Sequence, residues 1–403
     1  METKSVNKIG VLGAGLMGHG IAYVSALSGF NVVLVDTSNY QLEKAKKSIN
    51  AILTNELKNE QISKSDFENT LKCLRTSIDY NLLKNCDLII EAVNENVELK
   101  EKVISMSGQF LSKNGTFASN TSTIPIRLLA EAANEPEHFI GLHFFSPVHK
   151  MKLVEIIKGN KTNQRTISLA IEFVRTIGKE PIIVNDGPGF FTTRVFQCFT
   201  NEGMSMLYEG LEPALIETIA KKAGYPIGPL AILDEININL ASHINSQILK
   251  YSGGKIESSP SSWENVMHIM ISKLKRTGRS SGAGFYEYPT NSKKYLWPKL
   301  SEYLPISDSK FQETDLIDRF YFSQSLETIR CFEEGIISSS SDANTGSLLG
   351  WGFPAKTGGI LNFVNNYGLP EFKKRANELE QLFGERFRTP RLLEKMIVSK
   401  TAF

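Results

Sequence analysis

Short apolar runs alternate with amphipathic stretches over the first 185 residues of the chain. The apolar runs have the length and continuous hydrophobicity of strands that are buried on both faces. They lie at residues 9–12, 31–35, 87–93, 116–119 and 181–184. The amphipathic stretches have helical spacing and lie at residues 38–58, 98–110 and 166–177. This alternation predicts an α/β Rossmann-type domain, and the polar residues 59–80 are expected to be irregular.

The pattern changes at DGPGFFTTR, residues 186–194, where a glycine–proline turn precedes mostly helical sequence. We predict an all-α C-terminal region that begins with a long helix at residues 194–209, ended by Gly210. A second glycine–proline turn opens another helix within residues 224–235. Residues 253–315 are rich in Ser and Gly and are predicted to form a tail and linker.

The helical region contains two pairs of similar segments. EGMSMLYEG at residues 202–210 resembles ETIRCFEEG at 327–335. GYPIGPLAIL at residues 224–233 resembles GFPAKTGGIL at 352–361, so the offsets are 125 and 128 residues. Self-similarity at a nearly fixed spacing indicates a duplicated domain. The predicted domains are 1–185, 186–290 and 291–403.

The first strand–helix–strand unit carries a dinucleotide-binding fingerprint, G-x-G-x-x-G, in the segment GAGLMG. The first glycine permits a sharp turn, the second lets a pyrophosphate approach the backbone, and the third lets the helix pack on the strand. The helix N-terminus also directs N–H groups and partial positive charge at the phosphates. The predicted cofactor contacts in this turn are Gly13, Gly15, Leu16, Met17 and Gly18.

Asp36 ends the second strand, about 20 residues further on, where a carboxylate accepts hydrogen bonds from an adenosine ribose. It would repel a 2′-phosphate, and Thr37 and Ser38 offer no arginine, so the sequence favours NAD over NADP. Residues 9–35 hold no Asp, Glu, Lys or Arg, and could also be read as a membrane span or a signal peptide. Six glycines in register with the fingerprint favour the nucleotide site.

Two ionisable residues interrupt apolar strands later in the domain. His143 lies in one such strand, and Glu155 lies twelve residues later in a second. A lone His on an apolar strand is usually a core residue, but a buried carboxylate needs a partner. A His143–Glu155 pair would satisfy both groups and make a general base, in which the carboxylate fixes the tautomer of the ring.

Further polar groups follow the strand at residues 87–93. Glu95 and Lys100 could contact a ligand at the mouth of the sheet, or could simply cap the next helix. SNTST at residues 119–123 has the same two interpretations, substrate contact or a helix N-cap.

The composition narrows the function classes. A net charge of +2 with mixed signs lacks the basic footprint of a nucleic-acid-binding protein. The four cysteines form no C-x-x-C, and the six histidines form no H-E-x-x-H or H-x-H, so no metal site is indicated. Unpaired thiols suggest a reducing compartment, and we expect a cytoplasmic protein without membrane association.

Six segments resemble the L-3-hydroxyacyl-CoA dehydrogenase family of fatty-acid β-oxidation. They are GAGLMG (13–18), EAVNENVELK (91–100), SNTS (119–122), GLHFFSPVHKMKLVEII (141–157), DGPGFFTTR (186–194) and GYPIGP (224–229). The chain resembles in particular the dehydrogenase half of multifunctional α-subunits, which share FFSPV-x-KM, a G-x-GFY-x-Y linker and a C-terminal GFP-x-x-x-GG motif. Because the chain begins at the Rossmann strand, we expect it to lack their N-terminal hydratase domain.

The resemblance implies roles for individual residues. His143 matches the base that removes the 3-hydroxyl proton, Glu155 matches its orienting carboxylate, and Ser122 matches a serine that hydrogen-bonds the 3-oxygen. The residues that match cofactor contacts are Asp36, Glu95, Lys100 and Ser122, and Ser146 stands where many members have an asparagine near the nicotinamide. Two positions depart from the family pattern. Thr193 stands where many members have an Asn that hydrogen-bonds the substrate carbonyl. Trifunctional-type subunits resemble this chain here, because they also have a Thr-Thr pair. Ala283 stands where the linker motif often has a lysine.

The resemblance therefore implies NAD-dependent oxidation of an (S)-3-hydroxyacyl-CoA to a 3-ketoacyl-CoA, with a thiolase or hydratase as protein partner. A second helical copy could stand in for a dimer partner, which predicts a monomer with an internal pseudo-dimer; a homodimer is the alternative. One rival function is a 3-hydroxybutyryl-CoA dehydrogenase of storage or fermentative metabolism. Another is a catalytically silent NAD-binding scaffold, favoured only by Thr193. The HFFSPV…LVEII block disfavours a 2-hydroxyacid or imine reductase.

Overall fold

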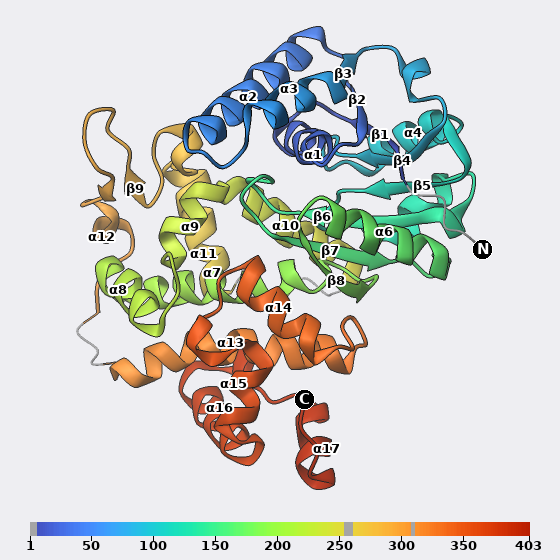
Figure 1. The fold of residues 1–403 in the computed structure, drawn as a ribbon. Helices are drawn as coiled ribbons and strands as arrows, with labels where there is room; N and C mark the ends of the chain where they lie inside the picture. The colour runs from blue at the N-terminus through green and yellow to red at the C-terminus, as the bar shows by residue number, and fades with distance from the viewer. Residues whose placement is uncertain (1–5, 254–260, 308–310) are drawn as a thin grey trace. The chain divides into compact units, whose positions relative to one another are not determined.

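The computed structural model describes residues 6–253, 261–307 and 311–403, and the chain divides into two compact units, Met1–Phe190 and Phe191–Phe403. The first unit combines a sheet with helices, and the second is mainly helical (Figure 1). The division falls five residues after the predicted boundary at 185/186. The other predicted boundary, at 290/291, lies inside the second unit.

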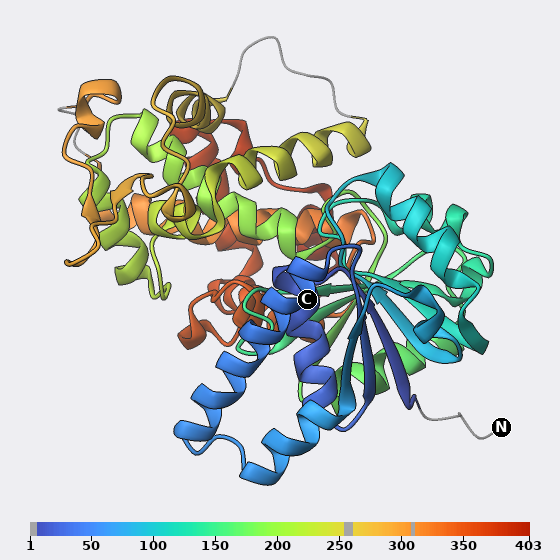
Figure 2. The ribbon, with the colours of Figure 1, turned by 90° about the horizontal axis from the view of Figure 1, so that it is seen from above.

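The first unit is built on an eight-stranded sheet with the order β3-β2-β1-β4-β5-β6-β7-β8. Its strands are β1 (Lys8–Leu12), β2 (Asn31–Val35), β3 (Leu74–Ser77), β4 (Cys86–Glu91), β5 (Leu111–Ser119), β6 (Phe139–Phe144), β7 (Leu153–Lys158) and β8 (Glu180–Asn185). Neighbouring strands are parallel except for the antiparallel pair β6–β7, and Figure 2 shows the twist of the sheet. The strand order reverses between β1 and β4, which is where open α/β sheets bind ligands at the strands' carboxyl ends.

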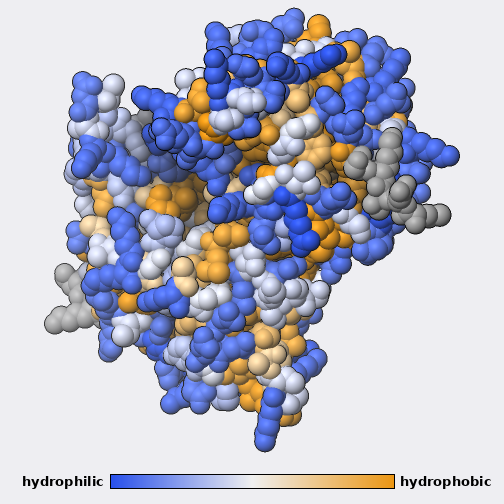
Figure 3. Space-filling model, in the orientation of Figure 1, coloured by the Kyte–Doolittle hydropathy of each residue, from blue (hydrophilic) through white to orange (hydrophobic). Residues whose placement is uncertain are grey.

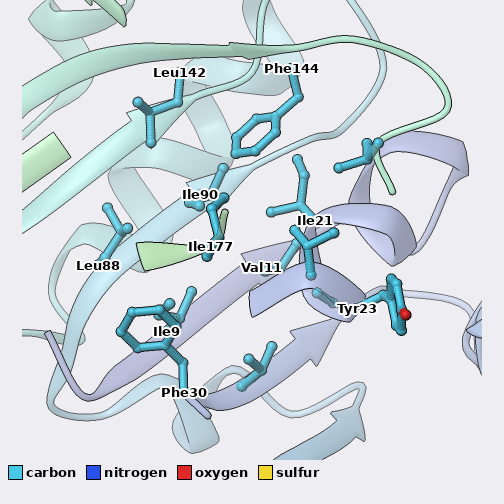
Figure 4. Close-up of a cluster of buried hydrophobic side chains, with 14 of the residues drawn as sticks. Ile9, Val11, Ile21, Tyr23, Phe30, Leu88, Ile90, Leu142, Phe144 and Ile177 are labelled. Carbon is cyan, nitrogen blue, oxygen red and sulfur yellow. The ribbon is translucent and has the colours of Figure 1, made fainter. Parts of the chain in front are cut away.

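Helices cover both faces of this sheet. They are α1 (Leu16–Leu27), α2 (Asn39–Lys58), α3 (Lys64–Cys73), α4 (Val97–Gly108), α5 (Ile126–Leu129) and α6 (Gln164–Thr176). Side chains of α1, α2 and α6 share one apolar core with the strands, part of which is drawn in Figure 4. Helix α4 packs against β4 and β5. The predicted Rossmann-type domain is thus confirmed.

Side chains alternate between the two faces along each strand, and this alternation places the polar groups. Leu88 and Ile90 of β4, and Leu142 and Phe144 of β6, point into the apolar core of Figure 4. The intervening positions toward the carboxyl ends of the strands therefore lie on the other face. These positions are Glu91 in β4, Ser119 in β5 and His143 in β6. Glu155 lies on the same face, near the amino end of β7, because β7 runs antiparallel to β6.

The prediction that residues 59–80 are irregular is wrong, because α3 and β3 lie there. Helix α3 begins with a capping box, in which Ser63 and Asp66 exchange hydrogen bonds. Only Thr70 of this helix is buried, so the segment lacks the apolar periodicity that reveals most helices. Strand β3 is a four-residue edge strand of mostly half-buried side chains, which gives an equally weak signal.

The second unit contains eleven helices within the described residues. They are α7 (Thr192–Tyr208), α8 (Pro213–Ala223), α9 (Pro229–Ile236), α10 (Ile238–Ser252), α11 (Ser262–His268), α12 (Leu300–Tyr303), α13 (Glu313–Glu333), α14 (Ser340–Gly350), α15 (Ile360–Tyr367), α16 (Leu369–Phe383) and α17 (Arg391–Ser399). A small antiparallel ribbon joins β9 (Tyr286–Glu287) to β10 (Tyr295–Leu296).

The segment 253–315 was predicted to be a tail and linker, and for residues 261–288 this is wrong. Helix α11 packs on α7 and buries Val266 and Met267. The carboxylate of Asp234 accepts hydrogen bonds from the backbone N–H groups of Phe285 and Tyr286, both at 2.9 Å. Despite its Ser/Gly-rich composition, this segment therefore packs on α7 and is hydrogen-bonded to α9. The part of this prediction at residues 254–260 and 308–310 lies outside the described residues.

Helices α7 and α13 pack against each other through two matching sets of ion pairs. Arg194 of α7 pairs with Glu327 at 2.6 Å and with Glu334 at the end of α13. Conversely, Arg319 of α13 pairs with Glu202 and, at 2.6 Å, with Glu209 at the end of α7. Arg319, Glu327 and Glu334 each stand 125 positions after Arg194, Glu202 and Glu209. The two interactions are therefore reciprocal.

The turns and caps that follow these helices are reciprocal as well. A Cβ on Gly224 would lie 3.1 Å from Pro354, and a Cβ on Gly352 would lie 2.8 Å from Pro226. These glycines and these prolines are each separated by 128 positions. Glu217 of α8 accepts the N–H groups of Leu230 and Ala231 at the start of α9. Asn344 of α14 likewise accepts those of Leu361 and Asn362 at the start of α15.

Hydrophilic side chains cover most of the face seen in Figure 3, and apolar ones form scattered patches. Among the residues that the structure describes, no helix is both long and apolar enough to cross a bilayer.

Candidate active site

His143 and Glu155 face each other across the antiparallel strands β6 and β7, where they are register partners. The Nδ1 atom of His143 lies 2.9 Å from Oε2 of Glu155. Glu155 is fully buried and His143 is 6% exposed. A neutral imidazole that donates Nδ1–H to a carboxylate carries its lone pair on Nε2. The arrangement can therefore accept a proton at Nε2 while the carboxylate stabilises the resulting imidazolium.

Two aromatic side chains lie near the imidazole of His143. The ring of Phe145 lies 4.5 Å from that of His143, centroid to centroid, and that of Phe190 lies 6.4 Å away. Phe190 has a positive φ of 50°, in the DGPGF turn. Such apolar walls lower the local dielectric and strengthen the His143–Glu155 interaction.

The SNTS segment lies beside β6, the strand that carries His143. The side-chain oxygen of Asn120 accepts the N–H of Phe144, the residue after His143, at 2.8 Å, and Asn120 donates its own N–H to Glu91. The backbone N–H of Ser122 donates to Glu95 at 2.9 Å. The structure thus ties Ser122, through its neighbours, to both Glu95 and the strand of His143.

Lys100 is fully buried, and its ammonium balances two carboxylates. Its Nζ lies 2.9 Å from Glu91 and 3.3 Å from Glu95. Burial would raise the pKa of Glu95, but the charge of Lys100, with hydrogen bonds from Thr121 and Ser122, lowers it below its usual value. Glu91 also accepts the hydroxyl of Ser119. Lys100 therefore compensates the charges of Glu91 and Glu95, and Glu95 in turn holds the loop after β5 through Thr121 and Ser122.

The fingerprint turn has the geometry of a phosphate-binding turn. Gly13 has a φ of +94°, and a Cβ on Gly18 would lie 1.7 Å from the carbonyl oxygen of Gly13. A Cβ on Gly15 would meet nothing within 4 Å, so open space lies where the pyrophosphate is expected. Leu16 and Met17 begin α1, with Leu16 exposed.

Asp36 lies next to this turn, at the end of β2. Its carboxylate accepts the N–H of Ala14 at 2.7 Å and that of Ser38 at 2.9 Å. The two hydrogen bonds orient the carboxylate at the fingerprint, as a ribose contact requires. The observed turn, helix and acid therefore fit a dinucleotide.

Two further predicted contacts belong to other elements of the chain. Ser146 is exposed in the loop between β6 and β7, whose residue Val148 packs on Gly20 of α1. Thr193 is the second residue of α7, in the helical unit, and is half-buried.

The sequence analysis did not single out Glu91 or Lys179, and it included Asn120 only within SNTST (119–123). Glu91 had a usable signal, since a carboxylate in the apolar run DLIIEAV needs a partner just as Glu155 does. The hydrogen bond of Asn120 to the backbone of Phe144 could not be predicted, because a backbone-capping amide resembles any other loop residue.

The first comparison with known proteins covers both units. The model of the "3-hydroxyacyl-CoA dehydrogenase, NAD binding domain" matches residues 8–187, and that of the "3-hydroxyacyl-CoA dehydrogenase, C-terminal domain" matches residues 189–288. The structure of an (S)-3-hydroxybutyryl-CoA dehydrogenase from Ralstonia eutropha is 33% identical, with a TM-score of 0.66, and the match covers 71% of this chain and 100% of that one. The chain belongs to the 3-hydroxyacyl-CoA dehydrogenase family. Its α/β domain is accordingly an NAD-binding domain.

Two other relatives match nearly the whole length of this chain. A "Fatty acid oxidation complex subunit alpha" from Shewanella loihica is 35% identical over 100% of this chain and 57% of its own length. The chain thus spans a little over half the length of the curated relatives that it matches. A 3-hydroxybutyryl-CoA dehydrogenase structure from Escherichia coli K12 has a TM-score of 0.84, covers 98% of this chain and 99% of that one, and at 24% identity shows a shared fold.

Proposed function

We propose that the protein catalyses the NAD-dependent oxidation of (S)-3-hydroxyacyl-CoA to 3-ketoacyl-CoA. The observation that carries this proposal is the buried His143–Glu155 pair, 2.9 Å apart, at the carboxyl end of a sheet that also bears the dinucleotide fingerprint. A base beside a hydride acceptor is what the oxidation of a secondary alcohol requires. The matching family models support this reaction class.

In the proposed mechanism, Nε2 of His143 accepts the proton of the 3-hydroxyl group. Glu155 keeps the ring oriented and stabilises the imidazolium, and Ser122 hydrogen-bonds the 3-oxygen. General-base assistance of this kind contributes about 10²- to 10⁴-fold. NAD, when bound, accepts the hydride. In the reverse direction His143 returns its proton to the oxygen of the 3-ketoacyl group.

The residues proposed to hold the cofactor are Gly13, Gly15, Leu16, Met17, Gly18, Asp36, Glu95, Lys100 and Ser146. The open space at Gly15 supports a pyrophosphate there. The carboxylate of Asp36 supports NAD rather than NADP, because it would repel a 2′-phosphate. For Lys100 we propose an indirect role, since its ammonium is already shared between Glu91 and Glu95.

The test follows NADH formation from (S)- and (R)-3-hydroxybutyryl-CoA, with NAD or NADP as oxidant. We expect turnover of the S enantiomer with NAD, and much slower turnover with NADP. NAD binding without turnover of this or any longer substrate would favour the silent scaffold, with Thr193 as the position to revert to Asn. A series of acyl chains from four to sixteen carbons separates a β-oxidation enzyme from a 3-hydroxybutyryl-CoA dehydrogenase of storage or fermentative metabolism.

We further propose that residues 291–403 repeat the helical fold of residues 186–290 and act as an internal partner for it. The reciprocal pairs Arg194–Glu327 and Arg319–Glu202 support this proposal, because a two-fold interface repeats each contact. Sedimentation equilibrium is expected to give a monomer of about 45 kDa. An obligate dimer would contradict the proposal. The curated relatives are named as subunits of a fatty acid oxidation complex, which supports association with another protein; we propose a thiolase or a hydratase as that partner.

A further inference from the structure

Lys179 is a buried lysine that the proposed reaction does not use. It follows Gly178, between α6 and β8, and is 8% exposed. Its Nζ donates hydrogen bonds to the carbonyl oxygens of Val148 and Met151, each at 2.6 Å. Within the described residues, no carboxylate forms an ion pair with it. Burying an ammonium without a counter-ion is costly, so the carbonyl contacts carry the whole compensation.

Both carbonyls belong to the loop of residues 145–152, which joins β6 to β7. The N–H groups of Lys150 and Met151 donate to the carbonyl of Pro147, so the centre of the loop is a tight turn. The ammonium of Lys179 therefore binds one carbonyl near the start of this turn and one at its end. Because β6 ends just after His143 and β7 begins just before Glu155, the loop connects the two members of the catalytic pair.

The same loop packs on the helix that follows the fingerprint. A Cβ on Gly20 of α1 would lie 2.8 Å from Cβ of Val148, so the loop contacts the helix backbone closely. Three residues further along α1, the ring of Tyr23 meets that of His149 edge to face at 6.4 Å. The loop is therefore held between α1 on one side and the ammonium of Lys179 on the other. Ser146, a proposed cofactor contact, lies in it.

We propose that Lys179 is a positioning residue for hydride transfer, which fixes the loop 145–152 and with it the placement of the His143–Glu155 pair relative to the cofactor helix α1. This inference rests on the proposed dehydrogenase function and adds a residue to it. A misplacement of about 1 Å at reacting groups costs about 10²-fold in rate, so a single loop anchor has a measurable effect.

The charge of Lys179 gives the proposed loop anchor a pH dependence. Burial lowers the pKa of Lys179 to about 8. The titratable group that interacts with Lys179 is His149, whose ring also interacts with Glu56, Lys150 and His19. Burial lowers the pKa of His149 as well, so this ring is already neutral where Lys179 loses its proton. A neutral amine donates weaker hydrogen bonds to carbonyls than an ammonium does, so the loop loses its anchor above about pH 8.

The experiment compares wild type, Lys179→Met, Lys179→Arg and the exposed control Lys161→Met in the oxidation direction, from pH 6 to 10. Wild type and Lys161→Met are expected to lose kcat above about pH 8. Lys179→Met is expected to have kcat lowered about 10- to 100-fold at pH 7, with the Kd for NAD changed less than threefold, and no alkaline limb near pH 8. Lys179→Arg keeps its charge, so it is expected to retain most activity and to extend it to higher pH.

Hydrogen–deuterium exchange supplies a readout that does not need turnover. The peptide that contains residues 145–152 is expected to exchange faster in Lys179→Met than in wild type, while peptides from α2 are unchanged. Wild-type kcat and wild-type loop protection in Lys179→Met would overturn the proposal. So would an alkaline limb near pH 8 that persists in Lys179→Arg. A wild-type enzyme that turns over no substrate would instead refute the proposed function, and the exchange experiment would then decide the loop anchor alone.

Discussion

Individual side chains at the carboxyl end of the sheet divide into two groups by their partners. His143 and Glu155 pair with each other, so the imidazole keeps one nitrogen for chemistry. Lys100 and Glu91 are also fully buried, but their charges compensate each other and Glu95. Similar burial thus accompanies a proposed catalytic role in one pair and charge compensation in the other. The partner, rather than burial alone, indicates which role a buried charge has.

Replacing Glu155 tests the orientation of the base. In Glu155→Gln an amide takes the place of the carboxylate, so it no longer stabilises an imidazolium and can favour the wrong tautomer. We expect kcat to fall by about 10²-fold or more, while the Kd for NADH, measured by fluorescence, stays near the wild-type value. Glu137→Gln, a change in the same unit, serves as the control. A kcat within threefold of wild type would show that Glu155 only fills a buried position.

The contacts of some buried charged residues could be predicted from the sequence, and those of others could not. Glu155 could be predicted to pair with His143 because a carboxylate inside LVEII must find a partner. The contacts of Lys179 could not be predicted, because its two acceptors are backbone carbonyls about 30 positions away. A backbone carbonyl can belong to any residue type, so a hydrogen bond to it gives no signal in the sequence. An ion pair, in contrast, requires two charged residue types that can be recognised.

The elements around the fingerprint depend on glycine for two different reasons. Gly18 leaves room for the backbone of Gly13, and Gly15 leaves room for a ligand. The first requirement concerns the fold and the second concerns binding. Elements with such strong local signals were predicted within a few residues, including β1 and β2. Helix α3 and strand β3 were missed because each buries too few side chains to create a periodic pattern.

Two alanine substitutions separate these requirements. Gly18→Ala places a methyl group against the carbonyl oxygen of Gly13, so we expect a loss of about 2–4 kcal/mol in the free energy of unfolding. Gly15→Ala meets no protein atom within 4 Å, so the stability is expected to stay within about 0.5 kcal/mol of wild type. Its affinity for NADH is expected to fall at least tenfold, because the methyl group occupies the space proposed for the pyrophosphate. Urea unfolding and fluorescence titration measure the two effects. Equal NADH affinity in Gly15→Ala and wild type would contradict the proposed site.

Over the chain as a whole, the reciprocal contacts of α7 and α13 explain how the second unit holds together. Arg319 is fully buried and pairs with Glu202 and Glu209, while the matching Arg194 retains some exposure. The sequence predicted a duplication from short similar segments. It could not predict the ion pairs, since the register between two helices depends on packing rather than on periodicity. Because these ion pairs need ionised carboxylates, we expect the stability of the second unit to fall at acidic pH.

Glu202 provides the pH test of this helical unit. Burial alone would raise the pKa of Glu202, but the guanidinium groups of Arg319 and Arg386 lower it below its usual value of about 4.5. The ionised carboxylate therefore contributes stability above about pH 4.5, and this contribution is lost as the pH falls through the lowered folded-state pKa. Urea unfolding between pH 6 and 3 is expected to show this loss in wild type and in the exposed control Glu212→Gln. Glu202→Gln is expected to start about 3 kcal/mol lower and to have a flatter profile. A profile as steep as that of wild type would show that other groups cause the acid sensitivity.

The most direct test of the catalytic assignment follows NADH absorbance with acetoacetyl-CoA in wild type and in His143→Ala, together with NADH affinity for both proteins. We predict robust oxidation of NADH by wild type, a loss of at least about 10²-fold in kcat in His143→Ala, and similar NADH affinity in the two. Substantial turnover by His143→Ala would contradict the assignment of His143 as the base. NADH binding without turnover in wild type, on acetoacetyl-CoA and on a longer 3-ketoacyl-CoA, would contradict the proposed activity itself.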